Sequence, residues 1–326
     1  MHLSGQGGFA ARHGRTTNPI GSHTRTAGGL ARAALPYADA AGSEAVQVYV
    51  SNSRGWALPP GDPQQDVLFR DGCGERGLPV YVHASLLVNL GSPTALTVER
   101  SVDTLAHALT RGAAIGATAV VYHAGSSVDP AHDDKALHQL REALLPLLDR
   151  AAATGLPKLL VEPSAGGGRS LASKMPDLAP YLAAVEHHPW LGVCFDTCHA
   201  WAAGHDLATP GGMTATLDTL VATVGRERLM LIHANDAKDD CGSTRDRHET
   251  IGAGRIGAAA FAELCTHPAT AGVPVIVETP TERHEGHAAD IALLKSLRDA
   301  SGLVAKAATE GNLEITLSSR GAVDQS

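Results

Sequence analysis

The chain has 326 residues, enough for two domains, although a single α/β barrel of about 250 residues with extensions fits equally well. Hydrophobic residues make up 44% and charged residues 18%, so a large core is available and global disorder is excluded. The formal net charge of −8 argues against a nucleic-acid partner, unless several acids bind metal. Three divalent ions would bring the charge to about −2.

The cysteines and the hydropathy pattern indicate the compartment. The five cysteines form no Cys-x-x-Cys pair, which is typical of reduced thiols in a cytosolic protein. We expect Cys194 and Cys198 to be packed in the core rather than to bind metal. No apolar run approaches the roughly 18 residues of a membrane span, and no signal sequence follows Met1. We therefore expect a soluble, cytoplasmic protein.

The first predicted elements are a strand, a helix and a second strand. Residues 1–18 show no periodicity, and we expect a flexible N-terminal extension there. A short strand at 20–23 leads to residues 30–42, where apolar residues recur at helical spacing. Residues 45–50 then alternate as in a strand, and a polar loop follows at 51–56.

The next three predicted strands each end in a residue that can bind a metal. Long amphipathic helices at 98–115 and about 133–153 follow the first two, and a glycine-rich turn at 166–168 follows the third. The strands and their last residues are 80–83 with His83, 119–123 with His123, and 158–162 with Glu162.

A short apolar run at 192–195 ends abruptly in polar residues. Asp196 follows it directly, and His199 comes three positions later. This pattern predicts a buried strand that delivers both side chains to the rim, either in a loop or in a first helical turn.

Two further strands complete the series. Residues 229–233 end in His233, and residues 275–278 end in Glu278. Eight strands that alternate with helices predict one (β/α)₈ TIM barrel over residues 19–301. In such barrels the active site lies at the C-terminal ends of the strands.

Six consecutive strands thus end in His, Asp or Glu. At average composition each such end has a probability of roughly 0.2, so chance alone produces all six in far fewer than about one in a thousand cases. Three more candidates lie in loops: His199, Asp246 and His248, the last two on one side of an extended segment. Four carboxylates and five imidazoles suit two or three metal ions that activate water to hydrolyse a phosphate ester.

Six motifs occur in a fixed order along the chain. They are His123-Ala124-Gly125-Ser126, Glu162 with Ala165-Gly166, Gly192-Val193-Cys194-Phe195-Asp196-Thr197-Cys198-His199, His233-Ala234-Asn235-Asp236, Asp246-Arg247-His248 and Pro274-Val275-Ile276-Val277-Glu278-Thr279. Together they resemble the endonuclease IV family of apurinic/apyrimidinic DNA repair endonucleases. The likeness spans roughly Ile20 to Leu297.

The resemblance implies a centre of three zinc ions. By this likeness one ion is held by His83, His123 and Glu162, a second by Glu162, Asp196, His233 and Glu278, and the third by His199, Asp246 and His248. The resemblance also implies that Glu162, Asp196 and Glu278 are catalytic. The implied reaction cleaves the phosphodiester 5′ to an abasic site in double-stranded DNA, leaving a 3′-hydroxyl and a 5′-deoxyribose phosphate. The family also trims blocked 3′ ends.

DNA contacts follow from the same likeness. Asn52, Arg54 and Trp56 occupy the family loop that enters the DNA, with Arg54 at the position that wedges into the base stack. Leu86 stands where some relatives have a stacking tyrosine, and Pro163-Ser164 replaces the usual Asn-Thr. These departures bear on how the DNA is distorted, not on the metal chemistry.

Residues 302–326 form a C-terminal tail outside the likeness, in which 313–317 could be a strand or disordered. Two other readings compete. A sugar isomerase or epimerase on the same barrel would use one or two metal ions and would not need His199, Asp246 and His248. A damaged-DNA binding module would need no open metal position. The sequence shows no obligate protein partner, and we expect a monomer.

Overall fold

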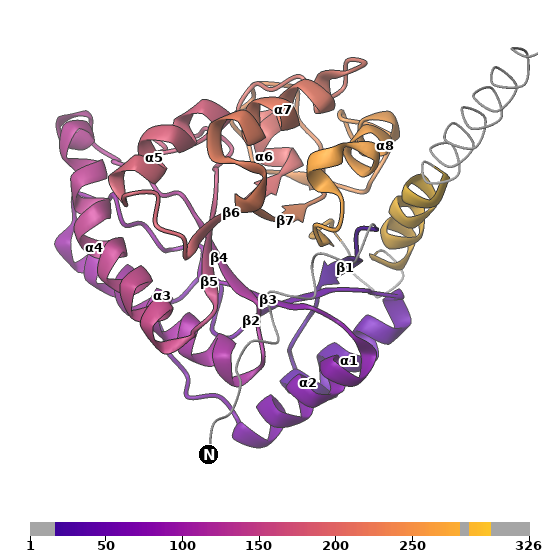
Figure 1. Cartoon of the computed structure of the whole chain (residues 1–326), viewed down its shortest axis with the longest axis horizontal. Coiled ribbons are helices and arrows are strands. Elements are labelled where there is room, and N and C mark those ends of the chain that lie inside the picture. Colours follow the sequence, from indigo (N-terminus) through magenta and orange to yellow (C-terminus); the bar gives the residue numbers. More distant parts are fainter. Residues whose placement is uncertain (1–16, 281–286, 301–326) are drawn as a thin grey trace, which may run out of the picture.

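The computed structural model describes residues 17–280 and 287–300. Eight parallel strands close into a barrel in the order β1-β10-β7-β6-β5-β4-β3-β2, and helices surround it (Figure 1). The predicted TIM barrel is therefore confirmed. The barrel strands are β1 (Ile20–His23), β2 (Val46–Tyr49), β3 (Val80–His83), β4 (Ala119–His123), β5 (Lys158–Glu162), β6 (Leu191–Asp196), β7 (Leu229–His233) and β10 (Val275–Val277).

Helices connect successive barrel strands, most of them on the outside. They are α1 (Leu30–Ala41), α2 (Pro63–Arg76), α3 (Ala95–Ala114), α4 (Asp133–Thr154), α5 (Leu178–Ala184), α6 (Thr197–Ala202), α7 (Gly212–Val224) and α8 (Ala258–Thr266). Short 3-10 turns lie at Pro130–His132, Met175–Asp177, Arg226–Arg228 and Pro268–Thr270. Residues 287–300 are also helical. The predicted helix at 98–115 begins three residues earlier than expected, at Ala95.

Helix α2 was not predicted from the sequence. Gly72 and Gly74 interrupt its apolar periodicity, yet its start carries standard signals: Pro63 in the first turn and Asp62 as the N-cap. The Asp62 carboxylate accepts hydrogen bonds from the backbone N–H groups of Gln64 and Gln65, at 3.0 and 3.3 Å. A Cβ at Gly72 would lie 2.5 Å from a methyl group of Leu35, so the glycine permits close packing of α2 against α1.

Apolar residues form two layers. The larger one lies between strands and helices, and the smaller one consists of strand and strand-flanking residues inside the barrel. Six inward residues, Tyr81, Val121, Leu160, Cys194, Leu231 and Ile276, lie two positions before His83, His123, Glu162, Asp196, His233 and Glu278, respectively. Because side chains alternate with a period of two, these six polar residues also point inward, one layer nearer the C-terminal mouth.

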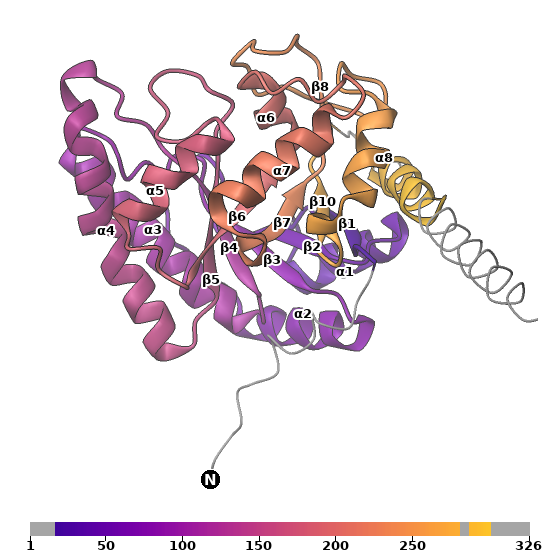
Figure 2. The ribbon, with the colours of Figure 1, turned by 45° about the horizontal axis from the view of Figure 1, so that its top comes forward.

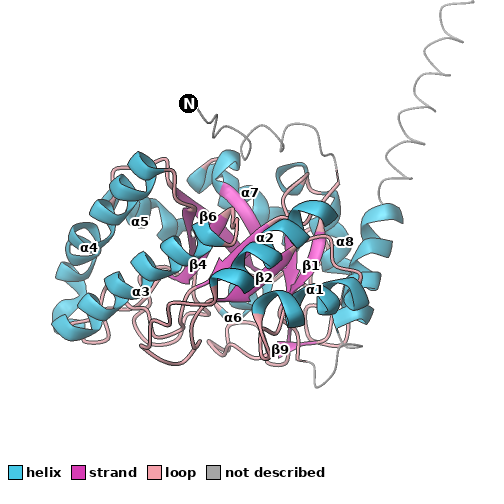
Figure 3. Cartoon of the chain, turned by 90° about the horizontal axis from the view of Figure 1, so that it is seen from below, coloured by secondary structure: helices cyan, strands magenta, loops and turns pink. Residues whose placement is uncertain are grey.

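Long loops gather at this mouth. Helix α6 and the small antiparallel pair β8 (Asp236–Ala237) and β9 (His248–Glu249) lie there, at the top of Figure 2 and among the loops at the lower edge of Figure 3. The loops therefore enclose the same end of the barrel that carries the polar residues.

The structure describes only part of the chain around the two predicted domain boundaries. Asn18, which we assigned to the N-terminal extension, is buried, and its amide donates to Thr270 O (2.5 Å) and Val273 O (2.9 Å). Asn18 therefore packs against the segment that precedes β10. Residues 1–16 of the predicted extension and the predicted tail (302–326, including 313–317) lie outside the described residues. Within the described part of the chain, no helix is long and apolar enough to cross a membrane.

Candidate metal centre

The Asp-x-x-His spacing is produced by a helix start. Asp196 is the last residue of β6 and the N-cap of α6, and its Oδ1 accepts the backbone N–H of His199 at 2.8 Å. This capping bond closes the first turn of α6 and turns His199 back toward the mouth. The predicted helical turn is therefore the one that forms, and both side chains are buried.

Two sets of contacts hold the loop that carries Asp246 and His248 at the barrel mouth. In the first, β9 pairs with β8, and His248 Nδ1 lies 3.2 Å from the carbonyl oxygen of Glu278. The buried Asp236 carboxylate, which follows β7, accepts backbone N–H groups of the next segment: Gly252 (2.9 Å), Gly254 (3.1 Å) and Ile256 (2.9 Å). A side chain at position 254 would collide with this carboxylate, so only glycine allows the loop to approach Asp236 this closely.

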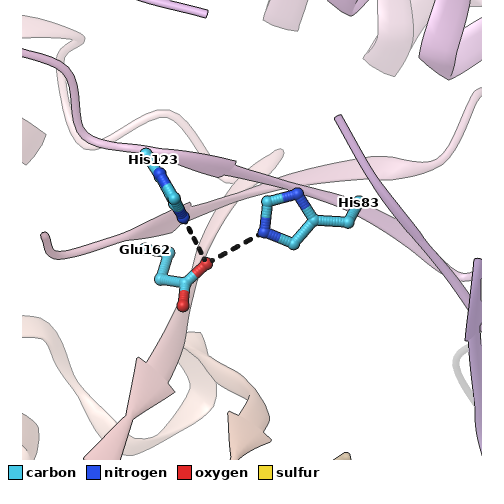
Figure 4. Close-up of side chains that lie close together, drawn as sticks. All are labelled: His83, His123 and Glu162. Carbon is cyan, nitrogen blue, oxygen red and sulfur yellow. Dashed lines mark hydrogen bonds and ion pairs between the residues drawn. The ribbon is translucent and has the colours of Figure 1, made fainter. Parts of the chain in front are cut away.

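Glu162 lies at the centre of the cluster and uses both of its oxygens. Oε2 faces Nε2 of His83 at 3.3 Å and Nε2 of His123 at 3.6 Å (Figure 4). Oε1 faces Nδ1 of His233 at 3.0 Å and Nδ1 of His199 at 3.3 Å. Each oxygen of the Glu162 carboxylate thus faces a different pair of imidazoles.

The remaining carboxylates complete the cluster. His233 Nδ1 lies 3.4 Å from Glu278 Oε2 and 3.8 Å from Asp196 Oδ2. At the outer side, Asp246 contacts His199 Nε2 at 3.2 Å through Oδ2 and His248 Nε2 at 2.9 Å through Oδ1. Among the groups whose ligand atoms lie within 4.8 Å of one another are His83–His123–Glu162, Asp196–His233–Glu278 and Asp196–His199–His248. All nine residues singled out from the sequence are therefore close together.

The imidazoles are oriented as metal ligands are. Nδ1 of His83, His199 and His248 lies within hydrogen-bond distance of a backbone carbonyl, at 2.7 Å (Ala84), 3.0 Å (Pro163) and 3.2 Å (Glu278). Donation from Nδ1–H leaves the Nε2 lone pair for an ion, an arrangement common around bound metals. His248 Nε2 is buried 2.9 Å from Asp246 Oδ1, but the two atoms do not form a well-aligned hydrogen bond. A cation held by both atoms would satisfy them.

The departure at Pro163-Ser164 leaves this arrangement intact. His199 contacts the carbonyl of Pro163, and a proline retains its carbonyl although it lacks the N–H. The sequence change therefore does not remove the contact that orients His199.

The charges of the cluster depend on one another. Burial alone raises the pKa of Glu162, but His233 and its neighbours bring that pKa well below its usual value. Burial likewise opposes the charge of His248, yet contact with Asp246 raises its pKa to about 9. Burial lowers the pKa of His123 to about 4, so this imidazole is neutral and ready to bind a cation. A bound metal ion would displace the protons that these imidazoles and carboxylates share.

The two cysteines of the motif are buried, as expected. Their sulfur atoms lie near the cluster: Cys194 beside Glu162 and His233, Cys198 beside Asp246 and His248. Burial raises the pKa of Cys194 to about 12 and raises that of Cys198 as well. Both are therefore neutral thiols here, whereas the nearby carboxylates are the stronger ligands for a hard or borderline cation.

The predicted DNA loop lies beside the cluster. Arg54 is exposed, and its backbone N–H donates to Asn52 Oδ1 at 2.8 Å, which closes a tight turn. The Ser85 hydroxyl donates to two carbonyls of this loop, Ser53 O (3.1 Å) and Gly55 O (3.2 Å), and so ties it to the end of β3. A hollow of about 500 Å³ is lined by Trp56, Leu86, Leu87, Val128, His123 and others, so it joins the loop to the cluster.

Three polar residues that contact the cluster were missed in the sequence. His23 ends β1 and lies 3.2 Å from Glu278 Oε1; Gln47 of β2 contacts both Glu278 and His233. Asn235 donates to Asp196 Oδ2 at 2.7 Å and accepts the Glu278 N–H at 2.8 Å. The signal was available for Gln47, since an uncharged polar residue at an inward position of a buried strand is unusual.

Comparison with known proteins identifies relatives of the chain. Residues 35–297 match the family described as xylose isomerase-like TIM barrel. The probable endonuclease 4 of Streptomyces coelicolor is 56% identical over 282 residues, 86% of this chain and 96% of the relative. The crystal structure of endonuclease IV from Thermus thermophilus superposes with a TM-score of 0.76 at 33% identity, over 86% of this chain and 99% of that one.

Sugar-converting barrels are more distant. A D-tagatose 3-epimerase-like protein shares 15% identity, with a TM-score of 0.67 over 88% of this chain and 99% of that one. Identity this low shows a common fold and nothing about the reaction.

Proposed function

The chain belongs to the endonuclease IV family of nucleases, and on this premise we propose that it is a zinc-dependent DNA repair endonuclease. It cleaves the phosphodiester on the 5′ side of an abasic site in duplex DNA, leaving a 3′-hydroxyl and a 5′-deoxyribose phosphate. It also trims blocked 3′ ends. It acts in the cytoplasm as a monomer.

One observation carries the proposal: Oε2 of Glu162 faces His83 and His123, whereas Oε1 faces His233. A single buried carboxylate shared in this way is suited to bridge two cations. The outer group of His199, Asp246 and His248 offers a third position, which a sugar isomerase with one or two ions does not require. We therefore assign three zinc ions to the nine residues.

The chemistry follows from this charge distribution. Bound zinc acts as a Lewis acid and makes water nucleophilic near neutral pH. The residues of the chain hold the site rigid: Glu162, Asp196 and Glu278 supply negative charge, and the backbone carbonyls fix the imidazole rings. The hollow beside His123, with Trp56 on its wall, gives a nucleotide that has left the stack a place next to the cluster.

The function and the ion count are tested together. Purified protein is expected to contain about three zinc ions per chain and to cleave a duplex with a single abasic analogue at its 5′ side. Prolonged chelation removes the ions and the cleavage, and added zinc restores both. Elemental analysis and product mapping are the measurements. Full activity with one tightly held ion, or no cleavage by zinc-loaded protein, contradicts the proposal.

Arg54→Ala is expected to lower kcat/KM on duplex abasic DNA by about tenfold or more. Holding a nucleotide out of the stack costs a few kcal/mol, and the planar Arg54 side chain can fill the vacated space. On a substrate with a blocked 3′ end, where little unstacking is needed, the loss should stay within about threefold.

Both substrates are compared at one salt concentration, because electrostatic contributions change strongly with salt. Arg70→Ala is the matched control: this exposed arginine lies on the outer helix α2 and pairs with Asp71. Equal losses on both substrates in Arg54→Ala would reduce Arg54 to a phosphate contact.

A further inference from the structure

His233 differs from the other oriented imidazoles of the cluster. His83, His199 and His248 turn Nδ1 toward backbone carbonyls, which no substitution removes. His233 is reversed: its Nδ1 faces the carboxylates of Glu162 and Glu278, and its Nε2 faces a side chain, Gln47 Oε1, at 2.9 Å. The orientation of this one ring therefore depends on a neighbouring residue.

The contacts of Gln47 determine which way its amide points. Gln47 is fully buried on β2, and its Nε2 lies 2.7 Å from Glu278 Oε1 and 3.0 Å from His23 Nδ1. The Glu278 carboxylate can only accept, so the amide nitrogen must face it. A flipped amide would set its oxygen against the carboxylate. Gln47 Oε1 is therefore left to face His233 Nε2.

The orientation of the Gln47 amide determines the tautomer of His233. Because Gln47 Oε1 is an acceptor, the proton of a neutral His233 ring lies on Nε2, and the lone pair lies on Nδ1. That lone pair points at the space between Glu162 Oε1 (3.0 Å), Glu278 Oε2 (3.4 Å) and Asp196 Oδ2 (3.8 Å).

We propose that Gln47 is a positioning residue for one metal ion: it holds His233 with Nδ1 toward the ion and holds Glu278 beside it. The inference rests on the proposed zinc centre. Gln47 lies on β2 and contacts His233, the last residue of β7, and Glu278, which directly follows β10, so it also joins strands across the barrel mouth. Partners of this kind typically change metal affinity or activity by roughly 10–100-fold.

The test uses two substitutions in the full-length, zinc-loaded protein. Gln47→Met keeps the length and removes both hydrogen bonds. Gln47→Glu keeps an acceptor for the His233 Nε2–H and loses the donor to Glu278. Zinc release to a coloured chelator is followed in time, alongside thermal unfolding in excess chelator. Gln65→Met is the control, since Gln65 is also buried and accepts two backbone N–H groups, at the start of α1.

Gln47→Met is expected to release one of the ions about 10–100 times faster than the parent, and the others within about threefold. Gln47→Glu is expected to release the same ion about tenfold faster or more, because it replaces the N–H donor to Glu278 with an oxygen that repels this carboxylate. Gln65→Met should leave every release rate within about threefold.

Each other outcome overturns the inference. Unchanged release in Gln47→Met shows that the amide does not position the ligands, and equal acceleration of all ions indicates a general loss of structure. If Gln47→Met does not fold, release from Gln47→Glu within about threefold of the parent is enough to contradict the role of the amide donor. Parent protein that holds no zinc contradicts the proposed function instead, so the two failures are distinguishable.

Discussion

Glu162→Gln is expected to reduce single-turnover cleavage of abasic duplex by on the order of 10³-fold while DNA binding changes little. Each oxygen of Glu162 contacts its own pair of imidazoles, so an amide group must present its NH₂ to one pair. An amide nitrogen does not bind a cation, and the lost charge weakens the hold on two ions at once. Contacts between the DNA backbone and the surrounding loops remain.

Cleavage and binding are measured on the same substrate, because only their separation identifies a loss in the transition state. Glu142→Gln is the matched control: this exposed carboxylate on the outer helix α4 pairs with His138 at 3.2 Å and has no contact with the cluster among the ion pairs of the described residues. A Glu162→Gln variant that cleaves within about tenfold of the parent would remove the bridging role.

Asp246→Asn is expected to lower cleavage by about 10²-fold and the zinc content from about three ions to about two. His199 Nε2 and His248 Nε2 contact different oxygens of Asp246, so one of them faces an NH₂ group after the substitution. The inner groups around Glu162 and Glu278 keep their carboxylates. The effect is smaller than for Glu162 because only the outermost position is weakened.

Zinc content and cleavage are measured on the same preparation. Asp240→Asn is the control, since this exposed carboxylate lies on the same loop and pairs with Arg255 at 3.5 Å. Retention of three ions together with normal cleavage would show that Asp246 is not a ligand.

The barrel could be predicted because its pattern is local. Most barrel strands are short apolar runs with a clear end, and six of these ends, from β3 onward, were read from the sequence as an acid or a histidine, while His23 at the end of β1 was not. Period-two alternation then places these ends on the inner side, as found for Glu162 above Leu160. The Asp196-x-x-His199 spacing likewise depends only on the start of a helix.

Helix α2 shows where local pattern reading failed. Its apolar periodicity is weak, because the helix packs through Gly72 against Leu35 and exposes Val67 and Leu68. Its cap at Asp62 was the usable signal. Periodicity reports how much apolar surface a helix buries, and the buried face of α2 consists largely of Gln65, Asp66 and Gly72.

The sequence by itself determined the number of strands, the inward direction of their last residues and the chemical types of those residues, because these follow from alternation along a few neighbouring positions. Only the tertiary structure decided which nitrogen of each ring faces which oxygen. Gln47 and Glu278 are 231 positions apart, and closure of the barrel through β1 and β10 brings them to 2.7 Å. The orientation of His233 is set by contacts between strands, and no local pattern records such contacts.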